Sequence, residues 1–204
     1  MKLAIIMLAA GNSRRFGENK LLYEIDKVPM YRRILKELQE AKEVLETHIP
    51  KVTCTITIVT QYEEIRNYAA EQGMEVLINP HPEDGIASSL KIGLLANRNA
   101  DAALFTVSDQ PWLKSLTIVR LTEKYLNTGQ KIACPAVMDE DEICIGNPCL
   151  FSSAYFPELF RLTGDTGGKR VIKRHMEDTA LLFLEEKQEL TDVDTKAVIK
   201  NPDK

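Results

Sequence analysis

The chain has 204 residues, of which 44% are hydrophobic and 27% are charged, so we expect one folded domain over residues 1–204 and exclude a disordered chain. Its 26 Lys and Arg against 30 Asp and Glu give a formal net charge of −4, which argues against nucleic acid or an anionic membrane as a partner. No apolar run approaches the roughly 20 residues of a membrane helix, and the four cysteines form no CxxC pair, so we expect a reduced, cytoplasmic protein without a zinc or disulfide site.

Apolar runs alternate with amphipathic segments along the chain. Continuous apolar runs, which a sheet covered on both faces requires, occur at 3–9, 55–59, 76–78, 102–107, 132–137 and 180–184. Helical spacing occurs between them, at 30–47, 62–72, 87–97, 115–127 and 167–177. This order predicts an α/β fold, a three-layer α/β/α sandwich around a Rossmann-like, mainly parallel sheet. Ligands of such sheets bind at the carboxyl ends of the strands, which directs attention to the loops there.

The loop after the first predicted strand, residues 8–20 (LAAGNSRRFGENK), combines small residues with three cations. Small residues let backbone N–H groups approach a phosphate, and Arg15 and Lys20 can neutralise its charge. Gly11 and Gly17 enclose five residues and no Lys-Ser/Thr follows, so the loop is neither a Walker A motif nor GxGxxG. An ordinary strand-to-helix turn with its cations in solvent is the alternative.

The loop at residues 79–90 (NPHPEDGIASSL) leads into a predicted helix. Hydroxyl groups and free N–H groups at a helix start bind polar base edges as readily as they cap the helix, so both roles are open for Ser88.

Asp109 follows the buried run 102–107 and precedes Gln110 and Pro111. It either caps the next helix or binds Mg²⁺, which screens triphosphates and takes one or two protein carboxylates.

Further along the chain, the acidic residues 138–142 predict a hairpin tip between two strands, and Cys144 and Cys149 are expected to be packing thiols. The segment 162–170 (LTGDTGGKR) places glycines and cations at a helix start, which suits a phosphate. A glycine-rich turn capped by Asp165 is the alternative.

Taken together, these strings resemble the MobA-like nucleotidyltransferase family, and most closely its molybdenum cofactor cytidylyltransferase branch. Residues 8–20 match the signature L-A-A-G-x-S-x-R-[MF]-G-x-x-K, and 79–90 resemble N-P-x-x-x-x-G-[MI]-x-x-S-L. Asp109 and Pro111 form the D-x-P motif, 146–151 (GNPCLF) resemble G-[HN]-P-x-L-F, and 162–169 resemble L-x-G-D-x-G-[AG]-[KR]. The string DVDT at 192–195 matches only the first part of D-[IV]-D-T-P-E-D.

The resemblance implies a fold of the nucleotide-diphospho-sugar transferase type and a role for each motif. It implies that Arg15, Lys20 and Asp109 are catalytic and that Asp109 and Asp194 bind Mg²⁺. The implied nucleotide-binding residues are Leu8, Ala9, Ala10, Gly11, Ser13, Arg15, Lys20, Gly85, Ser88, Ser89 and Asp109. The implied acceptor-binding residues are Gly146, Asn147, Pro148, Gly164, Asp165 and Gly167.

The implied reaction moves CMP from CTP to the terminal phosphate of a pterin acceptor, molybdopterin carrying molybdenum, and releases pyrophosphate. The tripeptide Ala9-Ala10-Gly11 favours CTP within the family, and a molybdenum hydroxylase is the implied recipient of the product. The alternatives are guanylyl transfer to molybdopterin, cytidylyl transfer to a sugar phosphate or methylerythritol phosphate, and a noncatalytic cofactor-binding accessory protein.

Overall fold

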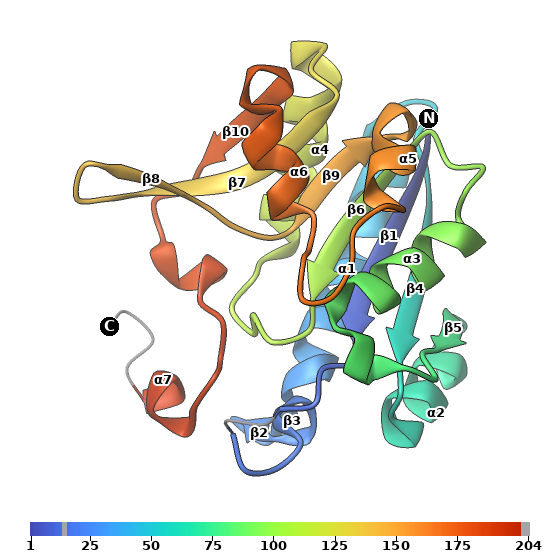
Figure 1. Ribbon diagram of the computed structural model, residues 1–204, viewed down its shortest axis with the longest axis vertical. Helices are drawn as coiled ribbons and strands as arrows, with labels where there is room; N and C mark the ends of the chain where they lie inside the picture. Colours follow the sequence, from blue (N-terminus) through green and yellow to red (C-terminus); the bar gives the residue numbers. More distant parts are fainter. Residues whose placement is uncertain (14–15, 201–204) are drawn as a thin grey trace.

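The computed structural model describes residues 1–13 and 16–200. Its main sheet has the strand order β10-β7-β9-β6-β1-β4-β5, and β8 pairs with β7 (Figure 1). The strands are β1 (Lys2–Ala9), β4 (Thr53–Thr60), β5 (Glu75–Ile78), β6 (Ala102–Val107), β7 (Ile132–Asp139), β8 (Glu142–Ile145), β9 (Cys149–Ser152) and β10 (Thr179–Phe183). A separate hairpin joins β2 (Glu24–Ile25) and β3 (Val28–Pro29). The central strands β6, β1, β4 and β5 are parallel, as predicted.

Helices cover both faces of the sheet, which confirms the predicted three layers. The helices are α1 (Met30–His48), α2 (Glu63–Glu71), α3 (Ile86–Ala96), α4 (Ser115–Thr128), α5 (Phe156–Leu159), α6 (Lys169–Arg174) and α7 (Lys196–Lys200). Figure 1 shows α3, α5 and α6 in front of the sheet and α1 and α4 behind it. None of the described helices is long and apolar enough to cross a membrane.

The central strand β1 supplies both hydrophobic cores because its side chains alternate between the two faces of the sheet. Ile5 and Met7 pack with the layer of α1 and α4, whereas Ile6 and Leu8 pack with the layer of α3, α5 and α6. At Gly93 of α3 a Cβ atom would lie 2.5 Å from Cγ2 of Ile6, so α3 lies unusually close to the sheet. The carboxyl end of β1 is therefore held from both sides.

The sequence pattern did not predict β9, which lies between β6 and β7 and runs antiparallel to both. Its apolar run is only three residues long (Cys149 to Phe151) and is too short to be distinguished from a packed loop. The predicted acidic hairpin is confirmed as β7–β8. The expectation for the thiols was half wrong, because Cys149 is buried and Cys144 is exposed on the hairpin.

Candidate functional site

The loop after β1 is fixed by side chains at the end of the neighbouring strand β4. Thr60 Oγ1 donates to the carbonyl of Ala9 at 2.9 Å, and Gln61 Nε2 donates to that of Ala10 at 2.8 Å. Tyr62 Oη donates to the carbonyl of Gly11 at 2.7 Å. Since three successive carbonyls accept these bonds, the backbone of residues 9–11 is fixed by the end of β4. Arg15, predicted to be catalytic, lies outside the described residues.

A cavity of about 440 Å³, here called the first cavity, opens at the carboxyl ends of β1 and β6. Its lining combines the loop after β1, the start of α3 and the end of β6. The lining residues are Leu8, Ala10, Gly11, Asn12, Ser13, Phe16, Lys20, Leu21, Pro82, Glu83, Gly85, Ile86, Ser89, Val107, Ser108, Asp109, Asp165 and Asp194. Most of the described residues predicted to bind nucleotide are therefore brought together, but Ala9 and Ser88 are not in the lining.

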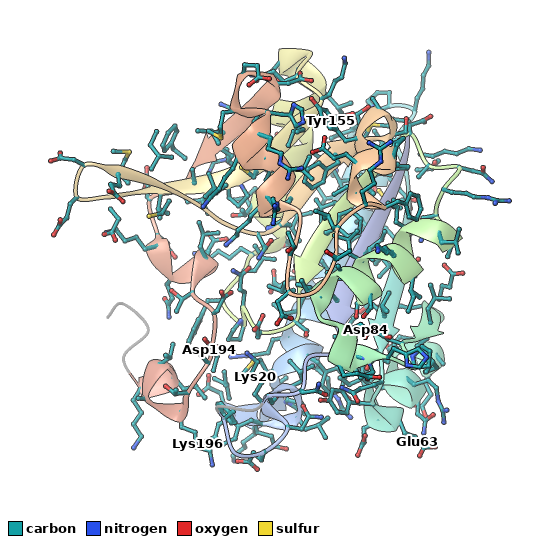
Figure 2. The ribbon with its side chains drawn as sticks, viewed as in Figure 1. Lys20, Glu63, Asp84, Tyr155, Asp194 and Lys196 are labelled. Carbon is teal, nitrogen blue, oxygen red and sulfur yellow. The ribbon has the colours of Figure 1, made fainter. Side chains whose placement is uncertain are left out.

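The ammonium group of Lys20 lies between two carboxylates of this cavity. Its Nζ is 2.7 Å from Oδ2 of Asp109 and 3.3 Å from Oδ1 of Asp194. Burial alone would lower the pKa of Lys20, but the attraction and hydrogen bonds of Asp109 and then Asp194 outweigh it, so the pKa is raised above its usual value. Figure 2 shows Lys20 and Asp194 close together below the sheet. Residues separated by 89 and 174 positions in the sequence thus converge on one point.

These two carboxylates have the chemistry of a divalent-cation site. They hold one cationic group, the ammonium of Lys20, between oxygens from two different segments. Carboxylate oxygens are the ligands Mg²⁺ and Mn²⁺ prefer, and Mg²⁺ commonly uses one or two of them with phosphate oxygens. The described residues contain no group of three or more His, Cys, Asp and Glu suited to a metal. A divalent ion held by Asp109 and Asp194 would fill its remaining positions with oxygens of water or of a bound substrate.

The start of α3 contributes a buried polar cluster around Asn79. Asn79 Nδ2 donates to Oγ of both Ser88 and Ser89 at 2.8 Å. The Ser88 hydroxyl donates to the carbonyl of Gly85 at 2.8 Å, which is a helix-start contact and not a cavity contact. Ser89 is buried and lines the first cavity, so its oxygen is held by Asn79 beside the space a nucleotide would occupy.

Two loops predicted to serve different substrates touch each other at Gly85 and Gly164. The N–H of Ala87 donates to the carbonyl of Gly164 at 3.1 Å. A Cβ atom on Gly85 would lie 2.3 Å from the carbonyl carbon of Gly164, and Gly85 has a φ of +82°. Only glycine fits there, since a side chain would clash with backbone and strain the dihedral angle. The loop at 79–90 and the loop at 162–168 are thus one packed unit.

A second cavity of about 620 Å³ lies beside the first, between the end of β6 and the start of α6. It is lined by Leu8, Ile86, Leu90, Phe105, Thr106, Val107, Asp109, Asn147, Cys149, Asp165, Thr166, Gly167, Gly168, Lys169, Arg170, Lys173 and Asp192. Leu8, Ile86, Val107, Asp109 and Asp165 line both cavities. Asp109 therefore stands at the boundary between them.

The second cavity contains some of the predicted acceptor-binding residues and several that were not predicted. Asn147, Asp165 and Gly167 line it, whereas Gly146, Pro148 and Gly164 do not. Lys173 and Asp192 also line this cavity, and the sequence had given neither of them a role. Lys173 lies one helical turn after Lys169, and that spacing was the available signal.

Asp192 lies near enough to Asp109 for the charge of Asp109 to affect its pKa. Burial raises the pKa of Asp192 above its ordinary value, and the negative charge of Asp109 raises it further. The amide of Gln110 donates to Oδ1 of Asp192 at 2.9 Å, which favours the ionised form. Asp109 at the boundary is thus flanked by Asp192 in the second cavity and Asp194 in the first, and Lys20 pairs with Asp109 and Asp194.

Comparison with known proteins identifies the family. Residues 5–179 match the family model described as the MobA-like NTP transferase domain. The chain belongs to the MobA-like NTP transferase family. A curated relative from Pyrococcus horikoshii, named probable molybdenum cofactor guanylyltransferase, is 28% identical over 137 residues. The match covers 66% of this chain but only 62% of that relative's length.

Solved structures share the fold of this MobA-like domain. The crystal structure of Rv0371c from Mycobacterium tuberculosis H37Rv superposes with a TM-score of 0.77 and 22% identity, over 98% of this chain and 96% of that one. A manganese complex of Rv0371c gives a TM-score of 0.68 and 20% identity, over 90% and 89% of the two chains. At these identities the likeness establishes the architecture and nothing finer.

Proposed function

We propose that this MobA-like chain is a metal-dependent enzyme that moves CMP from CTP to the terminal phosphate of molybdopterin carrying molybdenum. The observation that carries the proposal is the pair of adjacent cavities that share Asp109. A transferase needs two substrates whose reacting atoms meet, and this boundary is where a nucleotide in the first cavity meets an acceptor in the second.

In the proposed reaction an oxygen of the acceptor phosphate attacks the α-phosphorus of the nucleotide. A new P–O bond forms there, the bond from the α-phosphorus to the bridging oxygen breaks, and pyrophosphate leaves with that electron pair. A phosphate monoester is largely ionised at neutral pH, so the chain needs no strong base. Its work is to position both substrates and to stabilise charge.

Lys20 and the carboxylates of Asp109 and Asp194 have different roles in stabilising charge. A divalent ion bound by Asp109 and Asp194 would neutralise charge on the nucleotide phosphates. Lys20 now donates to both carboxylates. When a metal–nucleotide complex binds, we expect the ammonium of Lys20 to turn from the carboxylates to the phosphates. We expect Arg15 to neutralise phosphate charge as well. The manganese complex of Rv0371c supports a divalent ion in this fold.

The second cavity suits an acceptor that is both apolar and anionic. Its walls include the apolar side chains of Leu90 and Phe105. Lys169, Arg170 and Lys173 line it from α6, and the carboxylates of Asp109, Asp165 and Asp192 line it as well. The three cations on one short helix favour a phosphate on the α6 side of this cavity. A phosphorylated pterin has this combination of a planar ring system and an anionic end.

The proposal must also name the nucleobase of the donor triphosphate. Ala9-Ala10-Gly11 favours CTP, whereas the Pyrococcus horikoshii relative is named a guanylyltransferase. Pyrophosphate release should be measured with each of the four NTPs, with and without molybdenum cofactor. We expect acceptor-dependent release with CTP and Mg²⁺, in a cytoplasmic protein whose product passes to a molybdenum hydroxylase. Release with GTP instead would move the proposal to guanylyl transfer, and tight nucleotide binding without turnover would support a noncatalytic accessory.

A further inference from the structure

The residue after Asp109 is a fully buried glutamine with an uneven pattern of hydrogen bonds. Gln110 Nε2 donates to the carbonyl of Leu190 at 3.1 Å and to Oδ1 of Asp192 at 2.9 Å. Its Oε1 has no hydrogen-bond partner among the described residues. Both partners of Nε2 are acceptors, so only the amide end of this side chain can satisfy them. The two hydrogen bonds donated by this buried amide thus join the residue after Asp109 to the segment 190–192.

The segment that Gln110 holds carries Asp192 and Asp194. It follows the 3-10 turn at Lys187–Leu190 and has no regular secondary structure until α7 begins at Lys196. A backbone bond of 2.9 Å from the N–H of Val193 to the carbonyl of Asp109 also fixes it. The N–H of Asp194 donates to the carbonyl of Asp192 at 3.1 Å, so the chain turns tightly between the two carboxylates.

The turn distributes the two carboxylates between the two cavities. Asp192 lines the second cavity and Asp194 lines the first, on either side of Asp109. These residues belong to no helix or sheet ladder, so side-chain bonds add to the backbone bond of Val193 in positioning them. Gln110, the residue next to Asp109 in the sequence, donates two of those bonds, to Leu190 and Asp192.

We propose that Gln110 is a positioning residue that sets the distance of Asp194 from Asp109 and so controls divalent-metal affinity. This inference rests on the proposed function, in which Asp109 and Asp194 bind the metal of the metal–nucleotide complex. Without the amide, Leu190 and Asp192 lose their shared donor, whereas the backbone bond of Val193 and the ion pair of Asp194 with Lys20 remain.

The test uses two variants of the full chain. Gln110→Met keeps the shape of the side chain without a donor, and Gln110→Glu replaces the donor with an acceptor facing Asp192. Binding of Mn²⁺ is followed by the electron paramagnetic resonance signal of the free ion, with CTP present at saturation, and the signal of the same CTP without protein accounts for the Mn²⁺ that CTP itself binds. We expect the Mn²⁺ Kd to rise at least tenfold in both variants. Turnover should fall as kcat at limiting metal and recover when the Mn²⁺ concentration is raised.

Thr117→Val is the matched control because it removes a buried bond between α4 and the 3-10 turn that precedes Asp192. Thr117 Oγ1 donates to Oε2 of Glu189 at 2.6 Å, and Glu189 precedes the carboxylates by several residues. We expect a comparable loss of thermal stability and a Mn²⁺ Kd within twofold of the unaltered chain.

Three outcomes overturn the inference. One is a Mn²⁺ Kd in the Gln110 variants within twofold of the unaltered chain. Another is an equal loss of metal affinity in Thr117→Val. A third is failure of both Gln110 variants to fold while Thr117→Val folds, which would make the role of Gln110 structural. An unaltered chain that binds no Mn²⁺ with CTP would instead refute the proposed function, and the inference with it.

Discussion

Replacing Lys20 with Met should change catalysis and metal binding in opposite directions. The substitution removes the ammonium that lies 2.7 Å from Asp109 and 3.3 Å from Asp194, and keeps the apolar stem of the side chain. At an effective dielectric constant of about 20, a unit charge at such distances attracts each carboxylate by on the order of 5 kcal/mol before desolvation. A divalent ion without nucleotide must compete with that charge, so its affinity should rise at least tenfold in Lys20→Met.

Turnover should fall in the same variant because the phosphates lose a stabilising cation in the transition state. Deleting one such electrostatic group costs about 2 to 4 kcal/mol of barrier, or roughly a 30- to 1,000-fold loss in kcat. The assays are pyrophosphate release with CTP and a Mn²⁺ titration without nucleotide.

Lys187→Met is the control for Lys20→Met. This exposed lysine also pairs with an aspartate, Asp139, but lines neither cavity. We expect it to leave both measurements unchanged. A kcat for Lys20→Met within threefold of the unaltered chain, or a weaker affinity for Mn²⁺ alone, would refute the reasoning.

Four further predictions follow from the structure. Asp109→Asn should abolish turnover and weaken Mn²⁺ binding in the presence of CTP at least tenfold; unchanged metal binding would contradict a role as ligand. Gly85→Ala should lower the melting temperature and weaken CTP binding, because its Cβ would lie 2.3 Å from backbone of the neighbouring loop, and full CTP affinity would argue against that packing. The native chain should react with one equivalent of a thiol reagent, at Cys144, because the other three cysteines are buried, and the unfolded chain with four. The raised pKa of Lys20 gives stability that is present below about pH 10.4 and is lost as the pH rises through the folded-state pKa, so alkaline denaturation should be less steep in Lys20→Met; equal curves would count against the ion pairs.

The parallel part of the fold was predictable because each strand there is a continuous apolar run. The predicted strand 102–107 coincides with β6, and the run at 3–9 falls within β1. The predicted helix at 167–177 was wrong in length, since α6 spans only Lys169–Arg174. The glycines at 167 and 168 lie outside the helix, because glycine is poorly suited to a helix interior. Residues 176 and 177 belong instead to a 3-10 helix at Met176–Asp178.

The candidate site was predictable where a motif marks the end of a strand. Lys20 and Asp109 each follow a predicted strand, and parallel strands end at one edge, so their meeting agrees with the topology. Asp192 lies in the partly matched string DVDT, but that string assigned a role only to Asp194, and Gln110 gave no signal. Their roles depend on a segment without periodicity that returns to this edge from far along the chain, and spacing alone carries no information about such a path.

The convergence on Lys20 has a consequence for how the protein is made. The ammonium group of Lys20 binds the carboxylate of Asp194, which lies 174 positions later in the sequence. During synthesis the strands that form the sheet leave the ribosome well before Asp194 does. A nascent chain that has completed β1, β4 and β6 therefore still lacks one of the two carboxylates, so catalytic competence should arrive late and abruptly, after most of the tertiary structure is in place.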